Sequence, residues 1–261
     1  MDIGSLLGIA MSFGLILLGN AMEGGTIKSL TAPTAALIVL GGTSGACVLQ
    51  FPFSVTLASL KAVISIFLPK KADAGSVIAQ LVEFAKRARR EGILALEKEI
   101  AEIKDPYLAK ALRMAVDGLE PKQLIETMET ELGTIEEKHE GPIKFWEACG
   151  GYAPTCGILG AVLGLIHVMA NLNDPSKLGE GIALAFVATV YGVGLANLVF
   201  LPFSTKLKLN ARNEIRVKEL ILKGVLLIQE GINHSIIEEQ LLSYLDEKTR
   251  SRYAAKAAAK G

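Results

Sequence analysis

The stretch ACGGYAPTCGILGAVLGLIHVMANL, residues 148–172, contains no Asp, Glu, Lys or Arg. As an α-helix with a rise of about 1.5 Å per residue, it is long enough to cross the roughly 30 Å hydrocarbon core of a bilayer. Three further stretches of 20 residues are also free of charge: residues 3–22, 31–50 and 182–201. The sequence therefore predicts an all-α membrane protein with four transmembrane helices.

The charged residues are concentrated in two long segments outside these spans. Of the 27 Lys and Arg residues, 14 lie in residues 51–147 and 11 in residues 202–261. Cytoplasmic loops beside membrane spans are enriched in Lys and Arg, so both segments and both termini are expected in the cytoplasm. The start, Met1-Asp2-Ile3, has no basic region typical of a signal peptide. The zero net charge gives no field that would attract nucleic acid.

This distribution predicts four parts of the chain. They are a transmembrane hairpin at 1–50, a cytoplasmic helical domain at 51–147, a second hairpin at 148–203, and a cytoplasmic C-terminal helix and tail at 204–261.

Helical periodicity and breaks refine the two cytoplasmic parts. Breaks at Gly92, at 105–106 and at 118–121 divide residues 74–140 into about four helices. The last of these is expected to continue into the third span. A helix is likewise expected to follow the fourth span over 204–246, and the Ala- and Lys-rich end is expected to be frayed.

Small residues in the spans predict close helix packing, within a bundle or between subunits. The glycines at such intervals are Gly4, Gly8, Gly41, Gly45, Gly157, Gly160 and Gly164. The cysteines Cys47, Cys149 and Cys156 form no CxxC pair. We expect them to be small buried hydrophobic residues with reduced thiols, rather than metal ligands or a disulfide framework.

None of the four spans contains a carboxylate, although ionisable groups at membrane depth usually mark an ion path. The polar candidates are Thr155 and Thr189, whose hydroxyls could equally bond only to their own helix backbones. Pro154 and Pro202 each lack an N–H group, so each is expected to bend or end its helix by freeing the carbonyl four residues earlier. His167 is read as an interfacial residue rather than a proton carrier.

The segment from Lys86 to Glu91, followed by Glu97, concentrates charge around Gly92. Such a run is explained either by a solvated helix face or by a docking surface for another protein. The glycine-rich run at 41–45 lacks the GK[ST] ending of a phosphate loop. The sequence gives no reason to expect a cofactor, a metal or covalent catalysis.

The run Gly150–His167, GGYAPTCGILGAVLGLIH, resembles the MotA family of flagellar motor stator subunits, in the broader group that includes ExbB and TolQ. Residues 173–177, NDPSK, and residues 188–192, ATVYG, agree with it. The order of two spans, a charged segment and two more spans also resembles MotA more than ExbB or TolQ, which have three spans.

The resemblance implies an ion-driven motor unit in the bacterial inner membrane, with a ring of five such chains around two MotB-like chains. The partner's transmembrane Asp would receive the ion. Pro154 and Pro202 match the two functional prolines of the family, and Thr189 matches the threonine that faces that Asp. Sodium-type relatives have Thr where this chain has Ala161, so the resemblance favours protons.

The family's rotor contact, Arg-x-x-Gly-x-x-x-x-Glu, is present as Arg89, Gly92 and Glu97, and would engage the rotor protein FliG. Arg90 and Glu91 are secondary candidates for the same contact. Two alternatives stay open at this point: an ExbB- or TolQ-like energy transducer for an envelope protein, and a membrane scaffold that conducts nothing.

Overall fold

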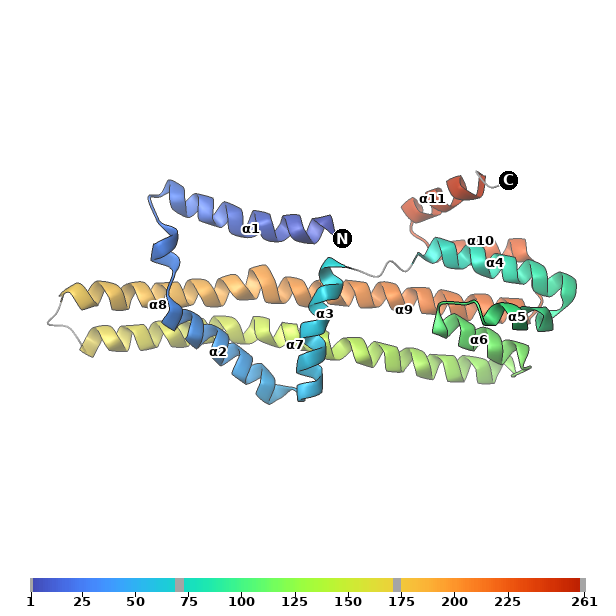
Figure 1. Cartoon of the computed structure of the whole chain (residues 1–261), viewed down its shortest axis with the longest axis horizontal. Coiled ribbons are helices and arrows are strands. Elements are labelled where there is room, and N and C mark those ends of the chain that lie inside the picture. Colours follow the sequence, from blue (N-terminus) through green and yellow to red (C-terminus); the bar gives the residue numbers. More distant parts are fainter. Residues whose placement is uncertain (1, 69–72, 171–174, 259–261) are drawn as a thin grey trace. The chain divides into compact units, whose positions relative to one another are not determined.

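The computed structural model describes residues 2–68, 73–170 and 175–258, and all regular elements within these ranges are helical (Figure 1). The predicted all-α fold is confirmed. The α-helices are α1 (Ile3–Met22), α2 (Pro33–Gln50), α3 (Phe53–Phe67), α4 (Ala74–Glu91), α5 (Glu97–Ile100), α6 (Pro106–Val116), α7 (Pro121–Ala170), α8 (Pro175–Leu195), α9 (Leu201–Gln229), α10 (His234–Leu242) and α11 (Glu247–Ala258). Between them lie the 3-10 segments η1 (Ile27–Leu30) and η2 (Ile93–Leu96) and the π-helical segment η3 (Ala196–Phe200).

The chain forms two compact units, each assembled from two separate stretches of sequence. The first unit consists of Met1–Lys70 and Lys138–Asn210, and the second of Lys71–Glu137 and Ala211–Gly261. Because α7 and α9 are long, each of these helices contributes residues to both units.

Four helical segments in the described part of the chain are long and apolar enough to cross a membrane: Ile3–Met22, Ile27–Gln50, Pro121–Ala170 and Gly181–Gln229. Three of them contain a predicted span whole, and Pro121–Ala170 contains the third span as far as Ala170, since residues 171 and 172 lie outside the described residues. The 50 residues of α7 confirm that the third span continues an N-terminal helix without interruption, even across Pro142 and Pro154.

Asp2 fixes the start of α1 in the first unit. Its carboxylate accepts a hydrogen bond from the Gly4 N–H group (3.2 Å) and pairs with Lys206 of α9. Its backbone N–H donates to the Phe67 carbonyl at 2.9 Å. The hydrogen bond from Lys206 is the main cause that lowers the pKa of Asp2 to about 2. No residue of α1 is buried, so its apolar side chains are free to contact lipid or other chains.

An aromatic cluster around Trp146 joins α3, α7, η3 and α9 in the first unit. The Trp146 ring stacks on Phe200 and meets Phe203 edge-on, with ring centroids 5.7 and 5.5 Å away. Its indole Nε1–H donates to the Ser59 carbonyl at 3.1 Å. These contacts attach α3 to α7 just before the third span and to the start of α9 just after the fourth.

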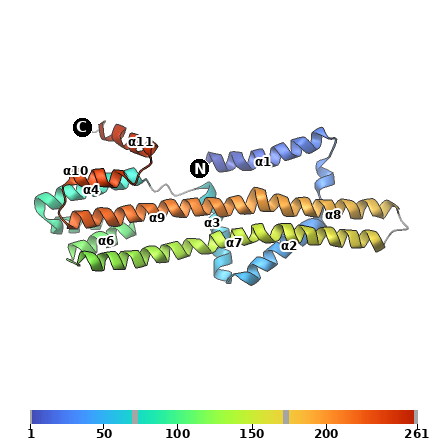
Figure 2. The same ribbon diagram turned by 180° about the vertical axis from the view of Figure 1, so that it is seen from behind.

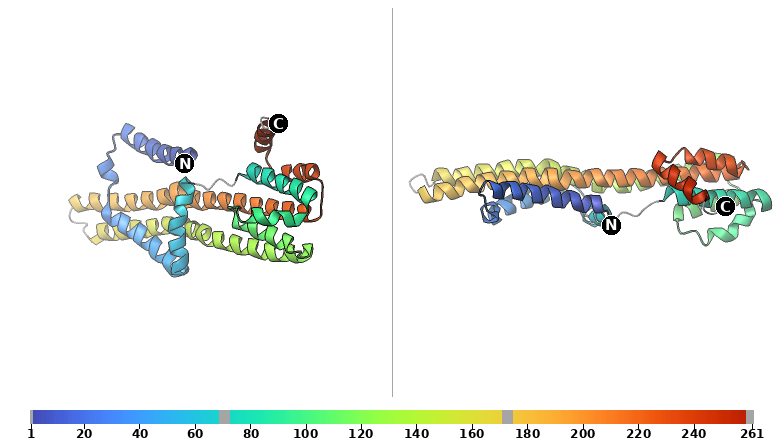
Figure 3. Two further views of the ribbon diagram at one scale, coloured as in Figure 1. Left: turned by 45° about the vertical axis from the view of Figure 1, so that its right-hand side comes forward. Right: turned by 90° about the horizontal axis from the view of Figure 1, so that it is seen from above.

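The second unit has its own hydrophobic core, in which α4 packs against α10 (Figure 3). Gly224 of α9 makes room for Leu81 of α4 and Leu241 of α10, both of which are fully buried. Lys218 of α9 donates to both carboxylate oxygens of Asp105 at 2.8 Å, which secures the start of α6. The predicted breaks at Gly92, at 105–106 and at 118–121 all separate helices here.

The prediction of one continuous helix over 204–246 is wrong. α9 ends at Gln229, because Gly231 adopts a φ of 72° that continues no right-handed helix. α10 then begins afresh, with the Asn233 side chain accepting from the Ser235 N–H at 3.1 Å. The chain end, expected to be frayed, forms α11 as far as Ala258. Asn173 and Asp174 of the quoted NDPSK motif lie outside the described residues.

Candidate functional sites

In the first unit, α7 and α8 run antiparallel in direct backbone contact (Figures 1 and 2). A Cβ atom on Gly192 would lie 2.5 Å from the Ala153 carbonyl oxygen, and one on Gly164 would lie 3.0 Å from the Gly181 carbonyl oxygen. Small residues allow this approach. The contact, called here the small-residue seam, is formed by Ala153, Gly157, Gly160 and Gly164 of α7 and by Gly181, Ala185, Ala188 and Gly192 of α8.

The structure separates the predicted packing glycines into two groups. Gly157, Gly160 and Gly164 lie in the seam, which confirms the prediction for the third span. A Cβ on Gly8, Gly41 or Gly45 would meet no heavy atom within 4 Å, and one on Gly4 would meet only Asp2 Oδ1, at 3.4 Å, so none of these four is in close contact with another helix among the described residues. Gly192 was missed, although the spacing of small residues at 181, 185, 188 and 192 could have revealed it.

Three of the candidate residues lie along one side of the seam. Pro154, Ala161 and Thr189 each follow a seam residue by one position and are half-buried. At 3.6 residues per turn, one position is a rotation of about 100°, and in an antiparallel pair this rotation leads to the same side on both helices. We call this side the Pro154 flank. Thr155 is exposed and turned away from α8, and Pro202 is exposed on α9.

The hydroxyl groups of the two candidate threonines are satisfied by their own helices. Thr189 donates to the Ala185 carbonyl at 3.2 Å, and Thr155 donates to the Tyr152 carbonyl at 2.8 Å. Tyr191 is different, since its hydroxyl donates to the Leu30 carbonyl at 2.6 Å and thereby fastens α8 to the segment before α2. Pro154, Ala161 and Thr189, the three residues named on the Pro154 flank, have no titratable side chain.

The two prolines occupy different helical contexts. Pro154 lies inside α7, whereas Pro202 is the second residue of α9, and only Leu201 separates it from the π-helical segment η3. There the Leu201 N–H donates to the Ala196 carbonyl five residues earlier, a pattern typical of a π-bulge. A Cβ on Gly150 would lie 2.5 Å from Leu201 Cδ2, so α7 packs directly on the first residue of α9 at a point four residues before Pro154.

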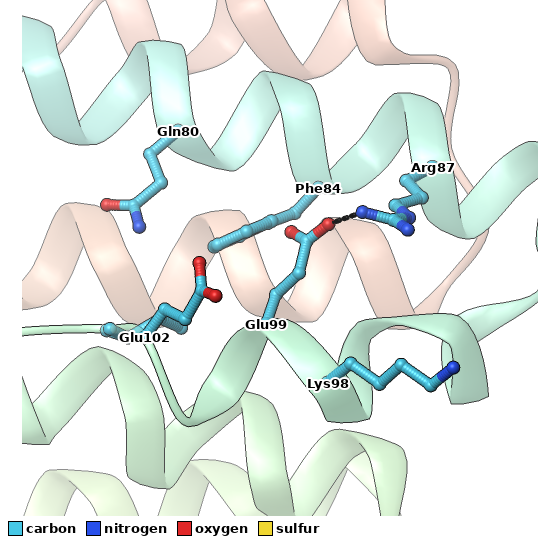
Figure 4. Close-up of a pocket in the computed structure, with 7 residues that line it drawn as sticks. Gln80, Phe84, Arg87, Lys98, Glu99 and Glu102 are labelled. Atoms are coloured by element: carbon cyan, nitrogen blue, oxygen red, sulfur yellow. Dashed lines mark hydrogen bonds and ion pairs between the residues drawn. The ribbon is translucent and has the colours of Figure 1, made fainter.

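In the second unit, α4 and α5 form a charged corner at Gly92. Arg87 of α4 pairs with Glu91 on its own helix at 3.4 Å and with Glu99 of α5 (Figure 4). Sequence reasoning missed Arg87, because its partner Glu99 lies across the turn. Arg90 approaches Glu91 at 3.9 Å.

The predicted docking residues Arg89, Arg90, Glu91 and Glu97 are all exposed at this corner. The described residues provide no ion-pair partner for Arg89 or Glu97, which leaves these two charges available. A shallow recess of about 410 Å³ adjoins the corner and is lined by Gln80, Phe84 and Glu102 together with the Arg87–Glu99 pair. Within the described ranges, no group of three or more acidic, His or Cys residues could hold a metal ion.

The fold and the two sites define a multi-span membrane protein with a tightly packed helix pair and a separate charged helical unit. Residues 99–220 match the MotA/TolQ/ExbB proton channel family, and residues 6–92 match the motility protein A N-terminal region. Motility protein A of Bacillus subtilis is 36% identical over 97% of this chain and 94% of its own length.

Two solved structures are similar in fold as well as in sequence. The chain in a C. jejuni MotAB structure has a TM-score of 0.91 at 32% identity, covering 95% of this chain and 97% of that one. The flagellar MotAB stator complex of Bacillus subtilis gives a TM-score of 0.88 at 35% identity, covering 96% and 99%. This chain therefore belongs to the MotA group of the MotA/TolQ/ExbB proton channel family. It is a multi-pass inner-membrane stator subunit of the bacterial flagellar motor.

Proposed function

We propose that this subunit conducts ions only together with a MotB-type partner, which places a carboxylate against the Pro154 flank. The carrying observation is that none of the four spans contains an acidic residue, while the hydroxyls of Thr155 and Thr189 are already bonded to backbone carbonyls. A carboxylate is the group that ion paths at membrane depth commonly use. The similarity to MotAB complexes supports a partner as its source.

The partner carboxylate changes its contacts with α7 and α8 when it gains or loses a proton, and this change permits a rotational step of the motor unit. In this proposal Thr189 meets the carboxylate from the Pro154 flank. Pro154 and Pro202 each lack the N–H group that would bond to the carbonyl four residues earlier, which lets their helices adjust at these two points. The cycle requires no covalent chemistry and no cofactor.

Protons are the proposed ion. Ala161 lies on the Pro154 flank and presents a methyl group, where a hydroxyl would offer an oxygen ligand to a hard cation. A proton needs only the partner's carboxylate.

The subunits form a ring, for which five copies around two partner chains is the arrangement implied by the family. The fully exposed side of α1 and the open positions at Gly8, Gly41 and Gly45 support contacts with neighbouring copies. Both termini face the cytoplasm, in accord with the distribution of Lys and Arg. The pairing of Asp2, before the first span, with Lys206, after the fourth, supports one common side for these two ends.

Co-expression with a MotB-type partner in a host that lacks its own stators is expected to restore swimming. Speed should follow the proton gradient and should not change when sodium is removed, because the flank offers no extra oxygen ligand at Ala161. The matched variant is Ala161→Thr, which restores a hydroxyl at that position. Swimming that depends on sodium in the native chain contradicts the proposed ion, and no swimming under either gradient contradicts the proposed function.

The charged corner docks on the rotor protein FliG through Arg89 and Glu97. Reversal of both, as Arg89→Glu with Glu97→Arg, is expected to reduce torque while membrane assembly survives. Placing like charges against the partner costs on the order of 2 kcal/mol, which weakens docking about 30-fold. Torque is measured on tethered cells. The control is Lys122→Glu, a reversal at an exposed position of the second unit outside the corner. Normal swimming under load after both reversals would contradict the proposal that the charged corner is the docking surface.

A further inference from the structure

Two cysteines that lie far apart in the sequence face each other in the first unit. The Sγ atoms of Cys47 on α2 and Cys149 on α7 are 3.1 Å apart, and both side chains are buried, with exposed fractions of 0% and 4%. Both thiols are free. A disulfide bond is about 2.05 Å long, so an approach of about 1 Å would join them. The third cysteine, Cys156, points at Gly42 rather than at another thiol.

The surrounding contacts hold the two sulfur atoms in place. Cys47 and Cys149 belong to one buried cluster with Ile66, Phe145, Trp146 and Leu207. Phe145 and Trp146 precede Cys149 on the same helix, with their rings edge-on and centroids 5.5 Å apart. This packing fixes the part of α7 that carries Cys149. The juxtaposition therefore depends on the packed core and not on a loose segment.

We propose that Cys47 and Cys149 form a redox site, which a peroxide-class oxidant converts into an intrachain disulfide joining α2 to α7. In the first step one thiolate attacks hydrogen peroxide, giving a sulfenic acid and water. In the second step the other thiol attacks that sulfur, forming the S–S bond and releasing a second water. The two thiols lose two electrons and two protons in total, and peroxide is reduced to water.

Burial decides the rates of the two steps. The first is slow, because attack requires a thiolate and access to the oxidant. The second is fast, because the receiving sulfur is already in contact and needs no further approach. The sulfenic acid is therefore captured before it can be oxidised further to the irreversible sulfinic acid.

The test treats the full chain, with its MotB-type partner in native membranes, with hydrogen peroxide. Unreacted thiols are then alkylated, and non-reduced peptides are analysed by mass spectrometry. We expect a peptide containing Cys47 linked to one containing Cys149, in chains that migrate as monomers, and reversal by dithiothreitol. Cys156→Ser should leave this product unchanged, whereas Cys47→Ser and Cys149→Ser should each abolish it.

The bond would join two residues that lie 102 positions apart in the sequence. It should therefore raise the midpoint of thermal unfolding by about 5 °C in the oxidised protein. No linked peptide, a link between two chains, or sulfinic acid as the main product would each overturn the proposal. These outcomes are independent of motility, so the proposal can fail or stand separately from the proposed motor function.

Discussion

Replacement of Gly192 by alanine is expected to destabilise the helix pair formed by α7 and α8 by about 3 kcal/mol. The new Cβ would lie 2.5 Å from the Ala153 carbonyl oxygen and 2.9 Å from Gly157 Cα. Both are backbone atoms, which cannot move aside by a change of rotamer. The two helices must separate, and the contacts along the small-residue seam are weakened together.

The effect of Gly192→Ala is measured as a lower thermal midpoint of the detergent-solubilised or nanodisc-embedded complex, and as loss of motility. Gly194→Ala is the matched control two residues along the same helix. A Cβ at Gly194 meets no heavy atom within 4 Å, and alanine favours a helix over glycine by about 1 kcal/mol. Equal stability of the two variants would show that the close approach of α7 and α8 at Gly192 does not contribute to the stability of the helix pair.

Motility is expected to be more sensitive than stability to this change. The seam fixes which residues of α7 and α8 face each other, and this alignment keeps Pro154, Ala161 and Thr189 on one side of it. A shift of about 1 Å at Gly192 moves Thr189 relative to Pro154, and errors of this size in a positioned site are known to be costly. A weaker variant at the seam, such as Ala188→Ser, should therefore slow swimming before it lowers the amount of assembled protein.

The spans and most helices could be predicted from the sequence, because their signals are local. An uncharged run of 20 residues defines a span, and Gly92 or Asp105-Pro106 defines a helix end, without reference to any other part of the chain. The break at Gly231 was equally local. It was missed because the apolar periodicity resumes after Asn233 and conceals the turn.

The contacts that complete the sites could not be predicted in this way. Cys47 and Cys149 are 102 residues apart, and Arg87 meets Glu99 only because the chain reverses at Gly92. Such pairs are fixed by packing and not by spacing. Among the glycines, the sequence indicated close approach at Gly157 and Gly41 alike. Only the placement of α8 shows that Gly157 lies in the seam while Gly41 remains open.

Replacement of Gly92 by alanine is expected to distort the charged corner while both Arg89 and Glu97 are retained. Gly92 has φ 85° and ψ 158°, a region that is essentially restricted to glycine. A side chain there costs about 1–3 kcal/mol through the backbone alone, since no heavy atom lies within 4 Å of the Cβ position. The chain avoids this strain by turning differently between α4 and η2, which displaces α5 and its Glu97 from α4.

If the proposed docking on the rotor is right, torque should therefore fall in Gly92→Ala as it is expected to fall on reversal of Arg89 and Glu97, although no charge has changed. Gly92→Asn tests whether the corner needs only a positive φ or also the ψ near 158° that glycine adopts there. Asparagine tolerates the left-handed helical region but not a ψ near 158°, so it should be as damaging as alanine. Gly133→Ala, in the middle of α7 with open space around it, should have no adverse effect. If Gly92→Ala keeps full torque, the rotor recognises the charged side chains and does not depend on the shape of the corner. If torque falls with assembly intact, the geometry set by Gly92 is part of what is recognised.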